Sequence, residues 1–142
     1  MSEDKSANPM DLTMNVSHKD GTHFLAENGA GSKIAMGGDN PHPIEYLIAS
    51  LGGCTGATVI KGLSEKGVKP ESFAVKVEGS RRKTLPTVFE KVHVTFVLSG
   101  DLDDRMVAEV VQETMTLKCP IAVTLGQVGD MTWEHHITGM QR

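Results

Sequence analysis

Two cysteines are the residues of this chain whose type and setting could do redox chemistry. Cys54 follows two glycines inside the apolar stretch LIASLGGCTGATVI, and taken alone it could equally be a small core residue. Cys119 directly precedes Pro120, a residue suited to the first position of a short helix. The unpaired backbone N–H groups at such a helix entrance favour a thiolate. The two cysteines are therefore a candidate redox pair, if the fold brings them together.

Glu45 is the third candidate residue, at the start of the same apolar stretch. It precedes Cys54 by nine residues, which on a helix places the two side chains about half a turn apart. They cannot touch through the helix itself. Two readings of Glu45 stay open: an acid that stabilises the first turn of the helix, or a carboxylate that orients a cation toward the reactive site.

Length and charge limit the classes of function. The chain has 142 residues, enough for a single domain spanning 1–142, with residues 1–9 expected to form a flexible tail. A net charge of -4 argues against binding to nucleic acid or to an anionic membrane. No unbroken apolar run approaches the roughly 20 residues that span a bilayer, and the polar start MSEDKSANPM carries no signal core. We expect a cytoplasmic protein, in which two cysteines are free thiols or a redox pair.

Hydrophobic periodicity predicts an α+β fold. Asp-Gly and Asn-Gly pairs within residues 12–36 indicate an antiparallel meander of two or three strands. Helical spacing of apolar residues runs from Ile44 to about Lys66, and it ends at a glycine and a proline. The element order is β-β-(β)-α-β-β-α-α-β, with the later strands near 73–77, 92–98 and 131–137 and the later helices within 101–118 and 119–125.

The long helix is also predicted to lie at an interface. Its apolar residues occupy two neighbouring stripes, which is more apolar surface than one sheet of short strands covers. Gly52 and Gly53 would let another backbone approach beside Cys54, since glycine has no Cβ. That neighbour is expected to be either the facing helix of a second copy or the backbone near Cys119.

These motifs resemble the OsmC/Ohr family, named for osmotically inducible protein C and organic hydroperoxide resistance protein. The stretch NPHPIEYLIASLGGC carries the family pattern Pro-x-Glu-x-Leu-x-Ala-x-x-x-x-Cys, and Cys119-Pro120 matches a second motif before a short helix. The element order is similar as well. The matching positions of the first motif are Pro43, Glu45, Leu47, Ala49 and Cys54.

The resemblance implies an OsmC-like fold, an intertwined homodimer and a site at the dimer interface. Two long central helices pack together there, and antiparallel sheets from both chains wrap around them. In peroxidase members the first cysteine attacks an organic hydroperoxide and the second closes a disulfide, which a dithiol then reduces. Carried over by position, Cys54 is peroxidatic and Cys119 is resolving, and no cofactor is implied.

The chain departs from the family pattern at two places. Peroxidase members carry an arginine in the N-terminal strands that pairs with the glutamate, whereas no arginine precedes Arg81 here and Lys19 stands in its place. Lysine supplies charge but not the bidentate fork. Ala122 stands where the family commonly has serine after Cys-Pro. These departures indicate a less characterised branch, and they leave a second function open: a non-catalytic dimer that binds a small apolar or electrophilic ligand in the interface pocket.

A metal site is not expected from the sequence. Six histidines and two cysteines occur, but no Cys-x-x-Cys, His-x-x-x-His or His-Glu-x-x-His spacing does. His135 and His136 are adjacent in a predicted strand, so they would point to opposite faces.

Overall fold

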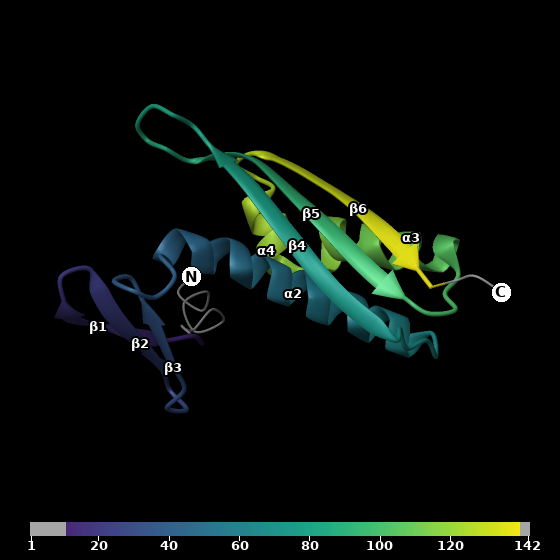
Figure 1. The fold of residues 1–142 in the computed structure, drawn as a ribbon, viewed down its shortest axis with the longest axis horizontal. Helices are drawn as coiled ribbons and strands as arrows, with labels where there is room; N and C mark the ends of the chain where they lie inside the picture. The colour runs from purple at the N-terminus through teal and green to yellow at the C-terminus, as the bar shows by residue number, and fades with distance from the viewer. Residues whose placement is uncertain (1–10, 140–142) are drawn as a thin grey trace, which may run out of the picture. The chain divides into compact units, whose positions relative to one another are not determined.

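The structure, a computed structural model, describes residues 11–139, so the tail predicted for residues 1–9 lies outside the described part. The chain divides into two compact units, one up to Tyr46 and one from Leu47 onward. Each unit is described by itself. The predicted order of strands and helices is confirmed across both units, and the optional third N-terminal strand is present (Figure 1).

The N-terminal unit contains a meander of three antiparallel strands. These are β1 (Met14–Asp20), β2 (His23–Asn28) and β3 (Lys33–Met36), hydrogen-bonded in the order β1-β2-β3. Gly21 makes the first turn with a φ of 49°, a conformation that glycine adopts without strain. The Asn28 side chain shapes the second turn by accepting hydrogen bonds from the backbone N–H groups of Ala30 and Ser32. Both predicted turn pairs therefore turn the chain.

Helix α2 (Pro43–Glu65) is the predicted long helix. It begins at a proline, whose fixed φ suits a first helical position. It ends before Gly67, whose φ of 76° lets the Val68 N–H reach back to the Leu63 carbonyl at 2.9 Å. Its fully buried apolar side chains, Leu51, Val59 and Leu63, recur at four- and eight-residue spacing and so share one face.

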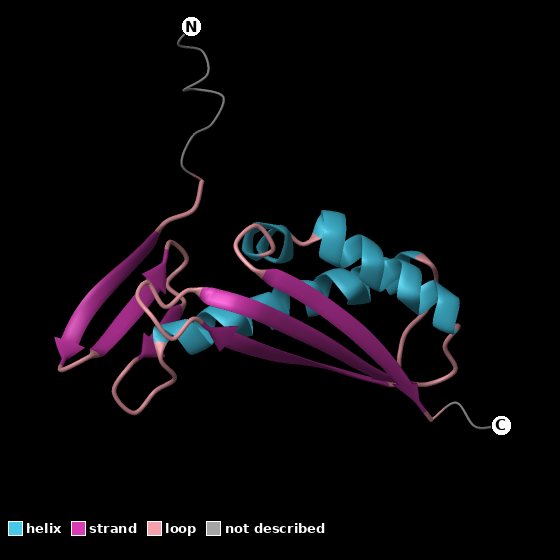
Figure 2. Ribbon diagram, turned by 90° about the horizontal axis from the view of Figure 1, so that it is seen from above, coloured by secondary structure: helices cyan, strands magenta, loops and turns pink. Residues whose placement is uncertain are grey.

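The C-terminal unit is built on a second sheet of three strands. β4 (Ser72–Arg81) and β5 (Phe89–Ser99) form an antiparallel hairpin, and β6 (Asp130–Thr138) pairs parallel to β5. A parallel pair needs a crossover connection, which the helices between β5 and β6 provide. Figure 2 shows those helices against one face of the sheet. That face carries the core side chains of the central strand: Val92, Val94, Phe96 and Leu98.

The crossover contains three helical segments where the sequence predicted two. Helix α3 (Asp104–Glu113) starts at an N-cap, Asp103, whose side chain accepts the Arg105 N–H at 3.1 Å. A π-helical turn, η1 (Thr114–Lys118), follows directly, and α4 (Pro120–Leu125) completes the crossover. The apolar spacing of residues 101–118 does not distinguish a π turn from a last α turn, because the extra residue per turn moves only a few side chains.

Three glycines let α2 lie close to its neighbours. A Cβ on Gly52 would sit 3.1 Å from a Val77 methyl group, and one on Gly56 would sit 3.3 Å from a Val75 methyl group. A Cβ on Gly62 would sit 2.8 Å from a Val110 methyl group of α3. The expectation for Gly52 is therefore corrected: what approaches it is β4, neither a second copy nor the backbone near Cys119.

Gly53 differs from these three glycines. A Cβ there would meet nothing within 4 Å among the described residues, so no neighbour within 11–139 requires a glycine. Its helix is also long and apolar enough, by length and composition, to cross a membrane, and within residues 11–139 it is the one helix that is. The sequence contains no unbroken apolar run of that length, because serine, glycine and threonine residues interrupt the helix. Part of this hydrophobicity is used inside the fold, because the buried side chains of α2 belong to the hydrophobic core.

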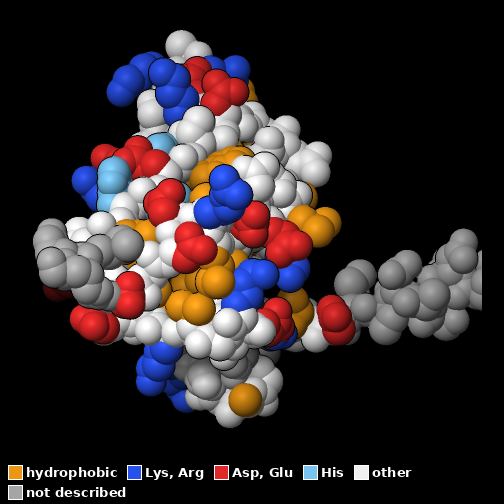
Figure 3. Space-filling view, turned by 90° about the vertical axis from the view of Figure 1, so that its right-hand side faces the viewer, with side chains coloured by type: hydrophobic (Ala, Val, Ile, Leu, Met, Phe, Trp, Pro, Cys, Tyr) orange, Lys and Arg blue, Asp and Glu red, His pale blue; other side chains and the backbone are white. Residues whose placement is uncertain are grey.

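The surface of the described residues mixes charges of both signs. On the face drawn in Figure 3, acidic and basic side chains alternate, with apolar side chains between them. Such mixing provides no concentrated positive field on that face.

Gly62→Ala and Gly53→Ala form a matched pair that tests this packing. Alanine raises helix propensity by roughly 1 kcal/mol at either position. At Gly62 the added Cβ presses on Val110, and overpacking of about 1–3 kcal/mol should make Gly62→Ala less stable than the parent. Urea unfolding should show Gly53→Ala as the more stable of the two. Equal stabilisation by both would contradict the close packing of α2 on α3.

Candidate functional site

The two cysteines, far apart in sequence, lie side by side in the C-terminal unit. The Sγ atoms of Cys54 and Cys119 are 2.9 Å apart, and both cysteines are free. That distance exceeds the length of an S–S bond by about 0.9 Å. Cys54 is half-buried on α2, whereas Cys119 is fully buried. A small side-chain movement is therefore enough to join the two sulfurs.

Cys119 is held at the junction of two helical segments. Its backbone N–H donates to the Thr114 carbonyl at 3.0 Å, which closes the π turn of η1. Its Sγ accepts the backbone N–H of Ala122 at 3.4 Å, so the thiol is the N-cap of α4 as the sequence predicted. π turns occur frequently at functional sites. Here the π turn and the cap together fix the direction in which the sulfur points.

The electrostatics of Cys119 differ from the sequence expectation. Burial raises the pKa of the Cys119 thiol, and the hydrogen bond to Cys54 raises this pKa further. The backbone N–H of Ala122 lowers it, as a helix entrance should, but this effect is the smaller one. The expected thiolate at Cys119 is thus corrected to a protonated thiol that donates to the Cys54 sulfur.

Two threonine hydroxyls near Cys54 donate to backbone carbonyls of α2. Thr55 donates to the Leu51 carbonyl at 2.8 Å, and Thr58 donates to the Cys54 carbonyl at 2.8 Å. Threonine hydroxyls that bond one turn back in this way remain inside the helix without an unpaired polar atom. The helix at the thiol is therefore continuous, and its side chains keep helical spacing.

Glu45 and Lys19 both belong to the N-terminal unit. The Glu45 carboxylate accepts the backbone N–H of His42 at 2.8 Å, the reciprocal half of a capping box. This contact matches the first of the two readings of Glu45. Lys19 is exposed on β1, at a bulge where the pairing with β2 shifts register. Neither residue forms an ion pair within the part of the chain that the structure describes.

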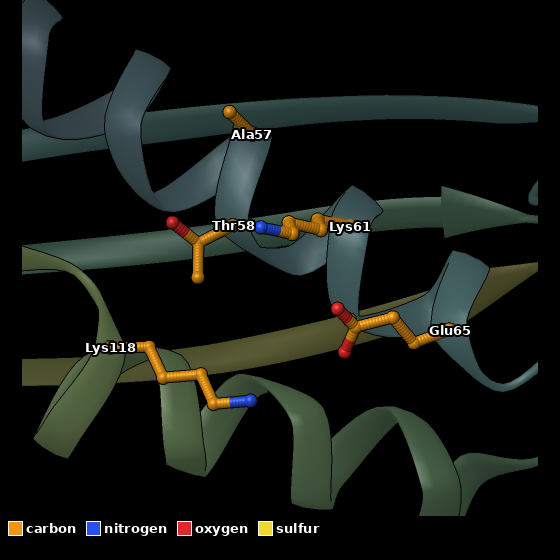
Figure 4. Close-up of a pocket in the computed structure, with 6 residues that line it drawn as sticks. Ala57, Thr58, Lys61, Glu65 and Lys118 are labelled. Atoms are coloured by element: carbon orange, nitrogen blue, oxygen red, sulfur yellow. The ribbon is translucent and has the colours of Figure 1, made fainter.

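A pocket of about 430 Å³ lies between α2 and η1 and includes residues that the sequence analysis missed. Thr58, Lys61 and Glu65 line it from α2, and Lys118 lines it from η1 (Figure 4). The signal was present in the sequence, since positions four, seven and eleven residues after Cys54 share one helix face.

A second cavity of about 250 Å³ has an apolar lining that includes Leu47, Phe89, Leu125 and Met131.

The histidines bind carboxylates on two faces of the sheet. His135 lies 2.8 Å from Asp104 of α3, while His136 bonds Glu134 on the opposite face, as adjacent strand residues should. His93 also bonds Glu134, at 2.8 Å, and the bonds from His136 and His93 lower the pKa of that carboxyl. Among residues 11–139, no three His, Cys, Asp or Glu side chains are arranged to hold a metal ion.

Comparison with known proteins agrees with this fold. The chain is 28% identical to the protein YhfA of Escherichia coli K12 over 123 residues, which is 83% of this chain and 92% of YhfA. The structure matches an OsmC-like protein from Mycoplasma pneumoniae with a TM-score of 0.78 at 15% identity, over 93% of this chain and 100% of that one. It matches an organic hydroperoxide resistance protein OsmC from Legionella pneumophila with a TM-score of 0.69 at 14% identity, over 89% and 98%.

The family model described as OsmC-like protein matches residues 36–134, which include both cysteines and the whole sheet of the C-terminal unit except its last strand positions. The two-sheet α+β architecture of the described residues agrees with that match. The chain belongs to the OsmC-like protein family.

Proposed function

We propose that this protein is a thiol-dependent peroxidase that reduces organic hydroperoxides. The observation that carries the proposal is the 2.9 Å separation of the Cys54 and Cys119 sulfurs. A single buried cysteine would be read as a core residue. Two free thiols within reach of a disulfide, in a chain of this family, support a reversible redox cycle.

The first step is the attack of the Cys54 thiolate on the distal oxygen of the hydroperoxide. The S–O bond forms as the O–O bond breaks, and the electron pair leaves on the alkoxide, which takes up a proton. Cys54 becomes a sulfenic acid, and the peroxide becomes an alcohol. Cys54 is assigned this role because its sulfur is half-buried and accepts the hydrogen bond, whereas Cys119 is fully buried.

The second step is the attack of Cys119 on the sulfenic acid, which forms the disulfide and releases water. Two of the causes that raise the Cys119 pKa, the hydrogen bond and the charge, come from Cys54. Oxidation of Cys54 replaces the thiol that makes both contacts, whereas the burial of Cys119, the largest cause, remains. A dithiol reductant then opens the disulfide by thiol exchange and leaves as a cyclic disulfide, which restores both protein thiols.

Lys19 and Glu45 are proposed to supply the charge pair that peroxidase relatives build from arginine and glutamate. Lysine provides the positive charge through one ammonium group and lacks the planar fork of arginine. Lys19 supplies the cation that favours the Cys54 thiolate, and Glu45 orients that cation. Glu45 does so in addition to accepting the His42 N–H at the start of α2.

The protein is further proposed to be a single-domain homodimer in the cytoplasm, with no nucleic-acid or membrane partner. Three large apolar side chains of α2 are 39–44% exposed: Ile44, Leu47 and Ile60. Exposed apolar side chains along one helix favour burial against a second copy. Cell fractionation that recovers the protein in the soluble cytosolic fraction would support this location, and recovery in the membrane fraction would refute it.

The second candidate function is a non-catalytic dimer that binds a small apolar or electrophilic ligand. The apolar cavity of about 250 Å³ favours it, because its lining suits a hydrocarbon group. The two functions differ at Cys54: a binder gives no sulfenic acid on treatment with peroxide, whereas a peroxidase does.

The peroxidase proposal predicts different losses for the two cysteines. Cys54→Ser should abolish turnover of cumene hydroperoxide, since no sulfur remains to attack. Cys119→Ser should still consume one equivalent of peroxide and should accumulate a sulfenic acid that dimedone labels, because no thiol resolves it. Mass spectrometry and a coupled dithiol assay measure both. Full turnover by Cys54→Ser excludes the proposal.

The charge-pair proposal predicts an order among variants at position 19. Lys19→Met should slow sulfenic acid formation at Cys54 about tenfold relative to the parent. Lys19→Arg should match or exceed the parent rate, since arginine can pair with a carboxylate through two hydrogen bonds. Stopped-flow oxidation at fixed pH gives these rates. Glu45→Gln keeps a hydrogen-bond acceptor for His42, so it separates the charge of Glu45 from its cap. Identical rates for all four proteins would remove both residues from the mechanism.

The dimer proposal predicts about twice the chain mass of 15.3 kDa in light scattering at micromolar concentration. Gly53→Val should weaken the dimer, because no residue of the described part of the chain fills the space beside Gly53, where the proposal places a second copy. Gly53→Ala is the control with the smaller side chain. A monomeric parent, or a Val variant that dimerises as tightly as the parent, would contradict this interface.

A further inference from the structure

The pocket between α2 and η1 begins one helical turn after Cys54 and one residue before Cys119. Thr58, Lys61 and Glu65 follow Cys54 by four, seven and eleven residues, which places them on one stripe of α2 with the thiol. The Thr58 hydroxyl donates a hydrogen bond to the Cys54 carbonyl at 2.8 Å. On the other wall, Lys118 immediately precedes Cys119. Each wall of the pocket therefore belongs to a helical segment that also carries or directly precedes one of the two cysteines.

The charge of the lining is positive. Two ammonium groups, from Lys61 and Lys118, face one carboxylate, from Glu65, and Figure 4 shows these three side chains extending into the same space. Lys118 also bonds Glu113 at 3.3 Å, but both side chains of that pair are about half exposed, which makes it a weak pair. Lys61 forms no ion pair with any residue of the range 11–139.

The direction of the side chains brings positive charge toward Cys54. Helical side chains lean toward the N-terminus of their helix, so the Lys61 side chain leans toward the turn of α2 that carries Thr58, and both residues line the pocket (Figure 4). Thr58 is one helical turn from Cys54, a rise of about 6 Å. An anionic group bound at Lys61 thus lies within one small molecule's length of the thiol.

We propose that Lys61 and Lys118 form an anion subsite that holds the carboxylate of a short hydroperoxide while its peroxide group reaches Cys54. This assignment rests on the proposed peroxidase function and names the substrate class of the same site. A volume of about 430 Å³ is within the range of small-ligand pockets and suits a molecule the size of a substituted benzene. The Glu65 carboxylate marks the far end of the subsite and disfavours anions beyond the two ammonium groups.

The test uses two hydroperoxides that differ only in charge: cumene hydroperoxide and its para-carboxylate analogue. In the double variant Lys61→Met and Lys118→Met, KM for the carboxylate analogue should rise about tenfold, since charged hydrogen bonds of this kind are lost. The ratio of kcat/KM for the carboxylate analogue to kcat/KM for neutral cumene hydroperoxide should fall by the same factor. Lys69→Met, outside the pocket, is the matched control and should leave this ratio unchanged.

A binding measurement separates this inference from the proposed function. Calorimetry with 4-isopropylbenzoate, which carries no peroxide, should show binding to the parent and a loss of about tenfold in the double variant, while neutral 4-isopropylbenzamide should not discriminate. Carboxylate binding without any peroxide turnover would retain the subsite and reject the peroxidase. Turnover of neutral peroxide with no charge discrimination in either assay would retain the peroxidase and overturn the subsite.

Discussion

The close packing of α2 against β4 and α3 is the constraint on which the rest of the C-terminal unit depends. At Gly52 and Gly56 the helix lies within reach of valine methyl groups of β4, and at Gly62 within reach of Val110 of α3. Side chains at these points would push the helix outward. Cys54 lies two residues from Gly52 and about 200° around the helix, so the contact of Gly52 with β4 leaves the Cys54 side chain on the other side of α2.

Cys119 approaches from the opposite side through an irregular backbone. A regular α-helix would carry its register on through Thr114, whereas the π turn widens the last turn and delivers Cys119 as the N-cap of α4. The cap orients the sulfur, and burial keeps it protonated. These two effects act in opposite directions on the thiolate, and desolvation is the larger of the two. The result is a buried, protonated thiol that donates to the Cys54 sulfur.

The sequence predicted the elements because each had a local signal. Proline at position 43 and glycine at 67 bracket α2, and alternating apolar residues identify the strands, so both could be read from neighbouring residues. The sequence indicates that Cys54 and Cys119 are a candidate redox pair, but it does not give the distance between them. That distance depends on how β4, β5 and α3, which lie between them in the sequence, fold. The role of Gly52 was misjudged because its neighbour, Val77, is a tertiary contact. Burial of Cys119 is likewise a property of the assembled core, and a helix-dipole argument made from Pro120 alone gave the wrong sign.

Helix α2 serves several purposes because its faces carry different chemistry. One stripe, which includes Leu51, Val59 and Leu63, is apolar and fully buried, and it fixes the helix to the core. A second stripe is small or exposed and apolar, with Gly53 and Ile60 on it, and it leaves room for another surface. The stripe between them carries Cys54, Thr58 and Lys61. The Cys54 sulfur therefore lies at the edge of the core, about one and two helical turns before two residues that line the pocket. Such a border position explains why the Cys54 side chain is half-buried although it contacts an interior cysteine. Moving the cysteine by one residue in either direction would rotate it about 100° around the helix and place it on a different face, so the position of Cys54 in the apolar pattern of α2 decides that its sulfur meets Cys119.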